Sequence, residues 1–193
     1  MLSRRSILAQ LLALAAAGGA AAQVKSGPQV GERPLPFTSN IVTGPERGKQ
    51  HCYVCELKDE PAVLVFARKT DEPTARLMRD LRDAVQKHRA EKLFGWFVFL
   101  GSRESASQTA LEQATYGFAR QHGSTNLPIS VLGDPQGPPG YLISPEADVT
   151  VLFFRRGSVV ANRSFTAKEW TPRAAAAALQ DLPKLLAAAP EKK

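Results

Sequence analysis

Runs of apolar residues alternate with segments of helical periodicity through most of this chain. Residues 62–67 and 93–100 are nearly continuous apolar runs, which is typical of strands buried on both faces. Between them, residues 70–73 combine a capping side chain, an acid and a proline, and so predict a helix start. The apolar stripe of that helix consists of Leu77, Met78, Leu81, Ala84 and Val85.

The second half of the chain repeats this alternation and ends in a hairpin and a helix. Residues 106–121 predict a second helix, and residues 127–132 predict a short strand before the Gly/Pro-rich loop 133–140. Two apolar strands, 149–155 and 158–165, flank a turn at Arg156-Gly157. The expected apolar side of the helix 106–121 consists of Ala110, Leu111, Ala114 and Phe118. A last helix is expected over residues 171–182, and Pro183 interrupts it.

This order of elements predicts an α/β fold with a mixed sheet. Crossovers through helices imply a parallel half, and the hairpin adds an antiparallel half. Residues 23–48 form a Pro/Gly-rich segment with little periodicity, which we expect to be an extended lead-in. We therefore divide the chain into a signal (1–22), the lead-in, one domain (49–187) and a polar tail (188–193).

The first 22 residues have the pattern of a bacterial export signal. Arg4-Arg5 matches the twin-arginine type, an apolar stretch follows, and Ala20-Ala21-Ala22 offers a cleavage site. The apolar stretch is shorter than the roughly 20 residues that a bilayer core requires, so we expect no membrane span after cleavage. The mature chain is expected in the periplasm or another extracytoplasmic compartment.

Charge excludes some classes of partner. The formal net charge of +7 falls to +5 without the signal, which holds two arginines and no acid. The remaining basic residues are mixed with acids, as in Arg79-Asp80 and Arg82-Asp83, which is typical of a solvated helix face. We therefore expect no nucleic-acid partner, and no motif predicts a cofactor.

The chemistry of the chain is concentrated in its only two cysteines, Cys52 and Cys55, in the sequence His51-Cys52-Tyr53-Val54-Cys55. A Cys-x-x-Cys pair near alternating strands and helices indicates thiol-disulfide exchange. An oxidising compartment also lets a disulfide persist. Its closed loop would be very short, so the entropic model predicts little stabilisation from it.

Several segments resemble the thioredoxin-like fold, most closely its redoxin branch, over roughly residues 41–187. They are Gly48-Lys49, residues 60–66, residues 127–129 with Asp134, residues 141–143, and the terminal hairpin 149–157. The resemblance implies a three-layer sandwich with helices on both sides of a mixed sheet. It also implies thiols or disulfides of cell-envelope proteins as partners.

The resemblance also locates where a redoxin carries its active site. In the family the reactive pair follows the first core strand, but the matching stretch here is Asp71-Glu72-Pro73-Thr74, without a thiol. The family's cis-proline matches Val149, for which we expect a trans peptide bond. Cys52 and Cys55 precede the first core strand, residues 62–67, so we expect them near the end of the sheet opposite to the family's active site.

Three interpretations of the pair remain open. In the first, Cys52 is exposed and attacks a substrate disulfide, Cys55 resolves the intermediate, and His51 or Lys49 favours the thiolate. In the second, the pair is a structural disulfide in a non-catalytic binding or scaffold module. In the third, His51 and both cysteines bind zinc or copper(I) with His88 or His122 as a fourth ligand, although no second Cys-x-x-Cys supports this.

Overall fold

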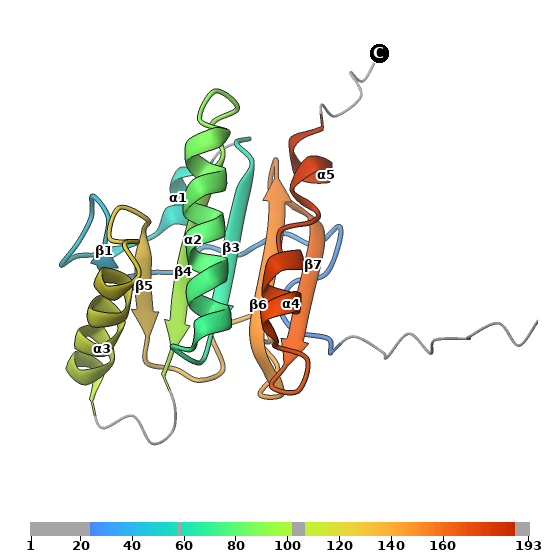
Figure 1. The fold of residues 1–193 in the computed structure, drawn as a ribbon. Helices are drawn as coiled ribbons and strands as arrows, with labels where there is room; N and C mark the ends of the chain where they lie inside the picture. The colour runs from blue at the N-terminus through green and yellow to red at the C-terminus, as the bar shows by residue number, and fades with distance from the viewer. Residues whose placement is uncertain (1–23, 58, 102–106, 188–193) are drawn as a thin grey trace, which may run out of the picture.

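A mixed seven-stranded sheet organises the part of the chain that the computed structural model describes, residues 24–57, 59–101 and 107–187. The expected export signal and polar tail lie outside these residues. Along the sheet the strand order is β2-β1-β5-β4-β3-β6-β7 (Figure 1). The strands are β1 (Ser39–Thr43), β2 (Gln50–His51), β3 (Ala62–Ala67), β4 (Phe94–Leu100), β5 (Ile129–Leu132), β6 (Ala147–Arg155) and β7 (Ser158–Thr166).

The sheet is parallel at its centre and antiparallel toward both edges. β4 runs parallel to both β3 and β5, whereas β6 is antiparallel to β3 and forms a hairpin with β7. On the other side, β1 is antiparallel to β5. This arrangement confirms the predicted α/β fold with its parallel half and terminal hairpin.

Four of the five described helices cover one face of the sheet. Figure 1 shows α2 (Glu72–Lys87), α3 (Gln108–Gln121), α4 (Pro172–Ala177) and α5 (Leu182–Leu186) on the near side and α1 (Tyr53–Glu56) on the far side. The far layer is therefore one short helix together with irregular segments of the chain. The sandwich has three layers, but its two outer layers are unequal.

Side chains of β3 divide the core into two clusters, as the period of a strand requires. Val63, Val65 and Ala67 pack with the near-side helices, and Leu64 and Phe66 pack with the far layer. The predicted stripe of α2 is confirmed, since Leu77, Met78 and Leu81 are all fully buried in the near cluster. α2 lies so close to β4 that a Cβ on Gly95 would come within 2.9 Å of Leu81 and Val85.

Two helices differ from their sequence-based expectations. In α3, Ala110 and Ala114 are exposed, and Thr115 and Ala119 are buried instead. The other two residues of the expected stripe, Leu111 and Phe118, are partly buried against the near cluster, so the predicted stripe is confirmed in part. The expected last helix is divided into α4 and α5. Pro183 lies in the first turn of α5, where backbone N–H groups have no partner within the helix, so the N–H that proline lacks is not needed.

The lead-in contributes more structure than its composition predicted. It contains β1, which lies between β2 and β5 in the sheet. Upstream, the buried hydroxyls of Ser26 and Thr150 are 2.7 Å apart, and Asn162 Nδ2 donates to the carbonyl oxygens of Ser26 and Pro28. The lead-in therefore crosses the far face and is attached to the hairpin at its start.

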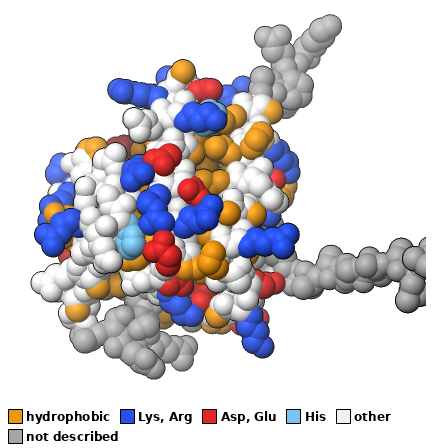
Figure 2. All heavy atoms as spheres, viewed as in Figure 1, with side chains coloured by type: hydrophobic (Ala, Val, Ile, Leu, Met, Phe, Trp, Pro, Cys, Tyr) orange, Lys and Arg blue, Asp and Glu red, His pale blue; other side chains and the backbone are white. Residues whose placement is uncertain are grey.

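On the face that carries the helices, basic and acidic side chains are interspersed (Figure 2). Along α2, Arg79 pairs with Glu72 at 2.8 Å, and Arg82 pairs with Asp83 at 2.7 Å. No single-sign stripe covers this face. Among the described residues, no helix is long and apolar enough to cross a bilayer.

Candidate functional site

Cys52 and Cys55 form a disulfide, with an S–S distance of 1.98 Å and a Cα–Cα distance of 5.4 Å. Cys52 is the N-cap residue of α1, and Cys55 is the third residue of that helix. The backbone N–H of Cys55 donates to Cys52 Sγ over 3.2 Å, so the sulfur takes the role that an oxygen usually has at a helix cap.

The disulfide lies beside the amino ends of the central parallel strands. Between the two cysteines, Tyr53 packs its ring 5.0 Å from that of Phe94, the first residue of β4, and 5.9 Å from that of Trp96. Figure 1 shows α1 behind the sheet, near the end where α2 terminates. The pair thus lies at the end of the sheet opposite to the start of α2, at a separation of about 20 Å given the six residues of β3.

The two cysteines differ in exposure. Cys55 and the following Glu56 are exposed, whereas Cys52 is only partly exposed. The two basic side chains expected to favour a thiolate both face carboxylates: His51 Nε2 is 3.2 Å from Glu56 Oε1, and Lys49 Nζ is 2.9 Å from Glu46 Oε2. Each of them therefore has an acidic partner of its own.

Tyr53 is a neutral group of the site at physiological pH. Burial raises the pKa of its phenol to about 12, and the charges of Glu46 and Glu56 act in the same direction. Its hydroxyl is buried and has no hydrogen-bond partner within the described residues. Tyr53 anchors α1 in the far cluster and provides no acid or base in the neutral range.

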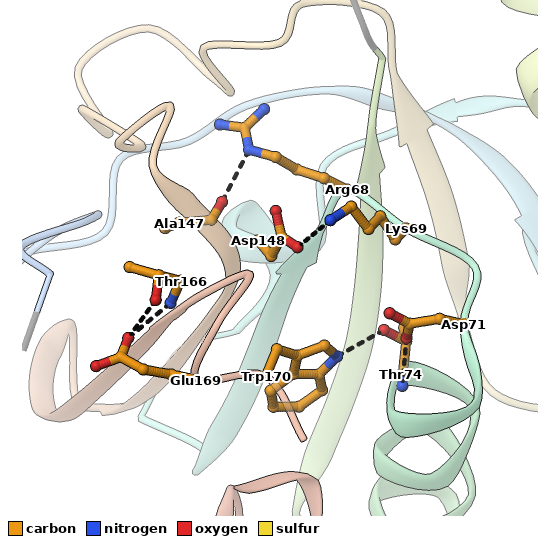
Figure 3. Close-up of polar contacts among 9 residues, drawn as sticks. All are labelled: Arg68, Lys69, Asp71, Thr74, Ala147, Asp148, Thr166, Glu169 and Trp170. Atoms are coloured by element: carbon orange, nitrogen blue, oxygen red, sulfur yellow. Dashed lines mark hydrogen bonds and ion pairs between the residues drawn. The ribbon is translucent and has the colours of Figure 1, made fainter. Parts of the chain in front are cut away.

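At the opposite end of the sheet, hydrogen bonds occupy the place that holds the reactive pair in redoxins (Figure 3). Asp71 Oδ1 accepts from the backbone N–H of Thr74 over 2.9 Å, and Thr74 Oγ1 accepts from Trp170 Nε1 over 3.0 Å. Asp71 and Thr74 are the N-cap and third residues of α2. They stand in the same relation to α2 as Cys52 and Cys55 do to α1.

The remaining polar groups in Figure 3 are also paired. Lys69 Nζ is 2.5 Å from Asp148 Oδ2, and Glu169 accepts two hydrogen bonds from Thr166. Arg68 donates to three carbonyl oxygens, those of Ala147, Pro135 and Ser144, at 2.7 to 3.0 Å. This end of the domain is thus held by structural contacts.

The backbone at the position of the family's cis-proline is also ordinary. No peptide bond in the described segments is cis, so the trans bond expected before Val149 is confirmed. A cavity of about 810 Å³ opens beside Arg68. It is lined mainly by the Gly/Pro-rich loop 133–140, by residues 142–145 that follow this loop, and by Lys25. Arg68 is already committed to carbonyl oxygens there, and the lining contains no thiol or histidine.

The structure does not assemble the ligands of the metal interpretation. Both cysteines are bonded to each other, His88 lies 3.4 Å from Glu91, and His122 lies 3.0 Å from Arg79. Across the described ranges, no group of three or more histidine, cysteine or acidic side chains is placed to bind a metal ion.

The sequence analysis missed two residues, Trp170 and Arg68, that hold the end of the sheet where α2 begins. Trp170 is 96 positions from Thr74, and nothing in the local pattern connects them. Arg68 did carry a signal, because a charged residue directly after a fully buried strand must find partners at the sheet's end.

Solved structures share the fold over most of the chain. A putative protein disulfide isomerase from Bacteroides thetaiotaomicron is 16% identical with a TM-score of 0.62, covering 84% of this chain and 94% of that one. A putative thiol:disulfide interchange protein DsbE from Chlorobium tepidum is 16% identical with a TM-score of 0.58, covering 82% and 98%. The pneumococcal exposed lipoprotein thioredoxin Etrx1 from Streptococcus pneumoniae is 18% identical with a TM-score of 0.54, covering 78% and 99%.

Sequence comparison adds no closer relative. No protein-family model matches the chain, and no curated protein matches it. At identities below one fifth, the structural likeness establishes the fold alone.

Proposed function

We propose that this divergent thioredoxin-fold protein carries out thiol-disulfide exchange outside the cytoplasm, through the Cys52–Cys55 pair. The observation that carries the proposal is a disulfide at the surface, with one sulfur at a helix N-cap and the other on the third residue of that helix. A dithiol at this spacing can form a mixed disulfide through one sulfur and release the partner through the other.

The position of the pair supports exchange at a new end of the fold. Asp71 and Thr74 hold the usual place without a thiol, and their polar groups are engaged in hydrogen bonds. Cys55 is exposed, so a partner's sulfur can approach the bond. Three solved structures of the same fold are described as a disulfide isomerase, an interchange protein and a thioredoxin.

An extracytoplasmic location is part of the proposal. Arg4-Arg5 and the following apolar stretch predict export, and a disulfide persists in an oxidising compartment. One of the structural neighbours is itself described as an exposed lipoprotein. The partners would be thiols or disulfides of other proteins in the cell envelope.

The test is reduction of insulin disulfides by the purified protein, with dithiothreitol as electron source. We expect the wild-type chain to accelerate the reaction, and the Cys52→Ser/Cys55→Ser variant to leave the uncatalysed rate unchanged. A matched control is Ser107→Ala/Ala110→Ser, which alters the N-cap and third residues of α3 and keeps the cysteines. Equal rates for the wild type and the cysteine-free variant would refute exchange.

A structural role for the disulfide is the competing function, and one observation favours it. Of the two residues enclosed by the bridge, Tyr53 is 6% exposed and contributes its ring to the far cluster, so the bridge fixes a helix that covers the sheet. Reduction potential separates the two roles: exchange catalysts lie between roughly −270 and −120 mV, and structural disulfides lie below about −300 mV. A value in the lower range, without insulin reduction, would assign the pair to structure.

A further inference from the structure

We propose that Cys55 is the sulfur that bonds to the partner, and that Cys52 is the resolving sulfur. This order is the reverse of the one that the sequence predicted, in which Cys52 attacks. The inference rests on the proposed exchange function and concerns the direction in which the same disulfide opens.

The first argument is access. Cys55 lies on the exposed side of α1 beside the exposed Glu56, whereas Cys52 is only partly exposed, between β2 and α1. On either side of Cys52, the rings of His51 and Tyr53 are in edge contact, with centroids 4.6 Å apart. A partner's thiolate must reach one of the two sulfurs, and Cys55 is the more exposed of the two residues.

The second argument is the leaving group. An attack on Cys55 expels Cys52 as a thiolate, and an attack on Cys52 would expel Cys55. The backbone N–H of Cys55 already donates to Cys52 Sγ over 3.2 Å, and a hydrogen bond to an ionised acceptor is stronger than one to a neutral acceptor. A thiol with a lower pKa leaves faster, so we expect the S–S bond to break with its electron pair on Cys52.

The resulting steps balance in sulfur bonds and electrons. A partner's thiolate attacks Cys55 Sγ, the Cys52–Cys55 bond breaks, and its electron pair remains on Cys52 as a thiolate. A second thiolate of the partner then attacks the partner's own sulfur, releases Cys55, and closes the partner's disulfide. The partner dithiol is oxidised by two electrons and the Cys52–Cys55 disulfide is reduced. The two protons that the partner's thiols lose on ionisation are taken up from solvent by the thiolates of Cys52 and Cys55. The reverse sequence reduces a partner disulfide.

The experiment is to trap the first intermediate. The oxidised wild-type protein is mixed with 2-mercaptoethanol, quenched with excess N-ethylmaleimide, and mapped by peptide mass spectrometry. We expect the mercaptoethanol adduct on Cys55 and the maleimide on Cys52, with an excess of about fivefold over the opposite pattern, as an ordinary hydrogen bond to the leaving sulfur would give.

The outcomes separate this inference from the function on which it rests. An adduct mainly on Cys52, or equally on both cysteines, would overturn the assignment of roles and leave exchange intact. An adduct on neither cysteine, together with no insulin reduction, would remove the exchange function and the inference with it.

A matched pair of variants gives a second readout that does not depend on the intermediate. Cys52→Ser and Cys55→Ser each leave one thiol in a protein without the bridge, and each is treated with a polyethylene-glycol maleimide under native conditions. A small reagent, N-ethylmaleimide, is used in parallel, because the ratio of the two rates removes the difference in thiolate fraction between the two cysteines. We expect the ratio of the large-reagent rate to the small-reagent rate to be several-fold higher for Cys52→Ser, because its remaining thiol is the exposed one. An equal or lower ratio for Cys52→Ser would contradict the access argument.

Discussion

Trp170 donates its indole N–H to the hydroxyl of Thr74 over 3.0 Å, and both residues are buried. The contact joins the first turn of α2 to the segment that precedes α4. In the resemblance to redoxins, Thr74 stands at the position of the second reactive cysteine. Thr74 carries no thiol, and its hydroxyl is engaged in a buried hydrogen bond.

Removal of the Thr74 hydroxyl is expected to destabilise the fold. Thr74→Val keeps the shape of the side chain but leaves the buried indole N–H of Trp170 without an acceptor, at a cost of about 1 to 3 kcal/mol. The measurement is the free energy of unfolding in urea. Insulin reduction should not change, because the Cys52–Cys55 pair lies at the other end of the sheet.

Thr74→Ser is the matched control, since it keeps the hydroxyl and loses only a methyl group. It should cost about 1 kcal/mol. If Thr74→Val were no less stable than Thr74→Ser, the hydrogen bond would contribute nothing to stability.

Reduction of the disulfide is expected to have a small effect on stability. The bridge closes a loop of four residues, for which the chain-entropy model gives a contribution of about 2 kcal/mol. Urea unfolding with and without dithiothreitol measures this difference. The Cys52→Ser/Cys55→Ser variant should show no response to dithiothreitol, and a loss above about 4 kcal/mol in the wild type would indicate that the bridge maintains the fold.

Tyr53 is expected to make the protein sensitive to alkaline pH. Its pKa is raised from 10 to about 12, so the folded state retains a proton that the unfolded state releases. The associated stability is present below pH 10 and is lost as the pH rises to about 12. Because Glu56, one of the charges that contribute to the shift, is exposed and screened by solvent, we expect a loss of about 1 to 2 kcal/mol and not the full value of the shift.

Tyr53→Phe provides the test of this pH dependence. The variant should lose less stability than the wild type between pH 10 and pH 12, as measured by urea unfolding at each pH. At pH 7 it should be at least as stable, since the deleted hydroxyl is buried without a partner among the described residues. Tyr116→Phe, which removes the hydroxyl of a tyrosine partly buried beside Arg47, is the control.

Arg68 is expected to hold the loop 133–146 against the sheet. Arg68→Lys keeps the charge, but an ammonium cannot replace a planar guanidinium that donates to three carbonyl oxygens. We expect a loss of about 2 to 3 kcal/mol and faster amide hydrogen exchange in the loop. Lys69→Ala, which breaks the exposed pair with Asp148, should cost less than about 1 kcal/mol.

Local patterns predicted the elements of this fold with good accuracy. The apolar run 62–67 is β3, and the combination of Asp71, Glu72 and Pro73 does begin α2, with Asp71 as its N-cap. The hairpin strands were predicted within a few residues of β6 and β7. These features depend on periodicity, capping and turn chemistry within a few neighbouring residues, which the sequence contains directly.

Elements that depend on distant contacts were not predicted. β1 lies in the Pro/Gly-rich lead-in, and it became a strand because β2 and β5 flank it in the sheet. The most buried positions of α3 differ from the expected stripe because its contacts with β5 and β1, and not its hydrophobicity alone, orient the helix. Propensity is a weak determinant where tertiary packing acts on a short segment.

For the candidate site, the sequence alone determined that two cysteines are available and that neither lies at the start of α2, where redoxins carry their reactive pair. With two cysteines that both precede β3 and no thiol at the start of α2, the sequence leaves the usual site without a thiol and favours a position near the amino end of β3, provided that the segment before β3 does not fold back along the sheet. Only the tertiary structure decided that the sulfurs are bonded to each other, that Cys55 is the more exposed cysteine, and that Trp170 donates a hydrogen bond to the hydroxyl of Thr74. Exposure and long-range hydrogen bonds arise from how segments far apart in the chain pack together, and no local pattern of residues specifies that.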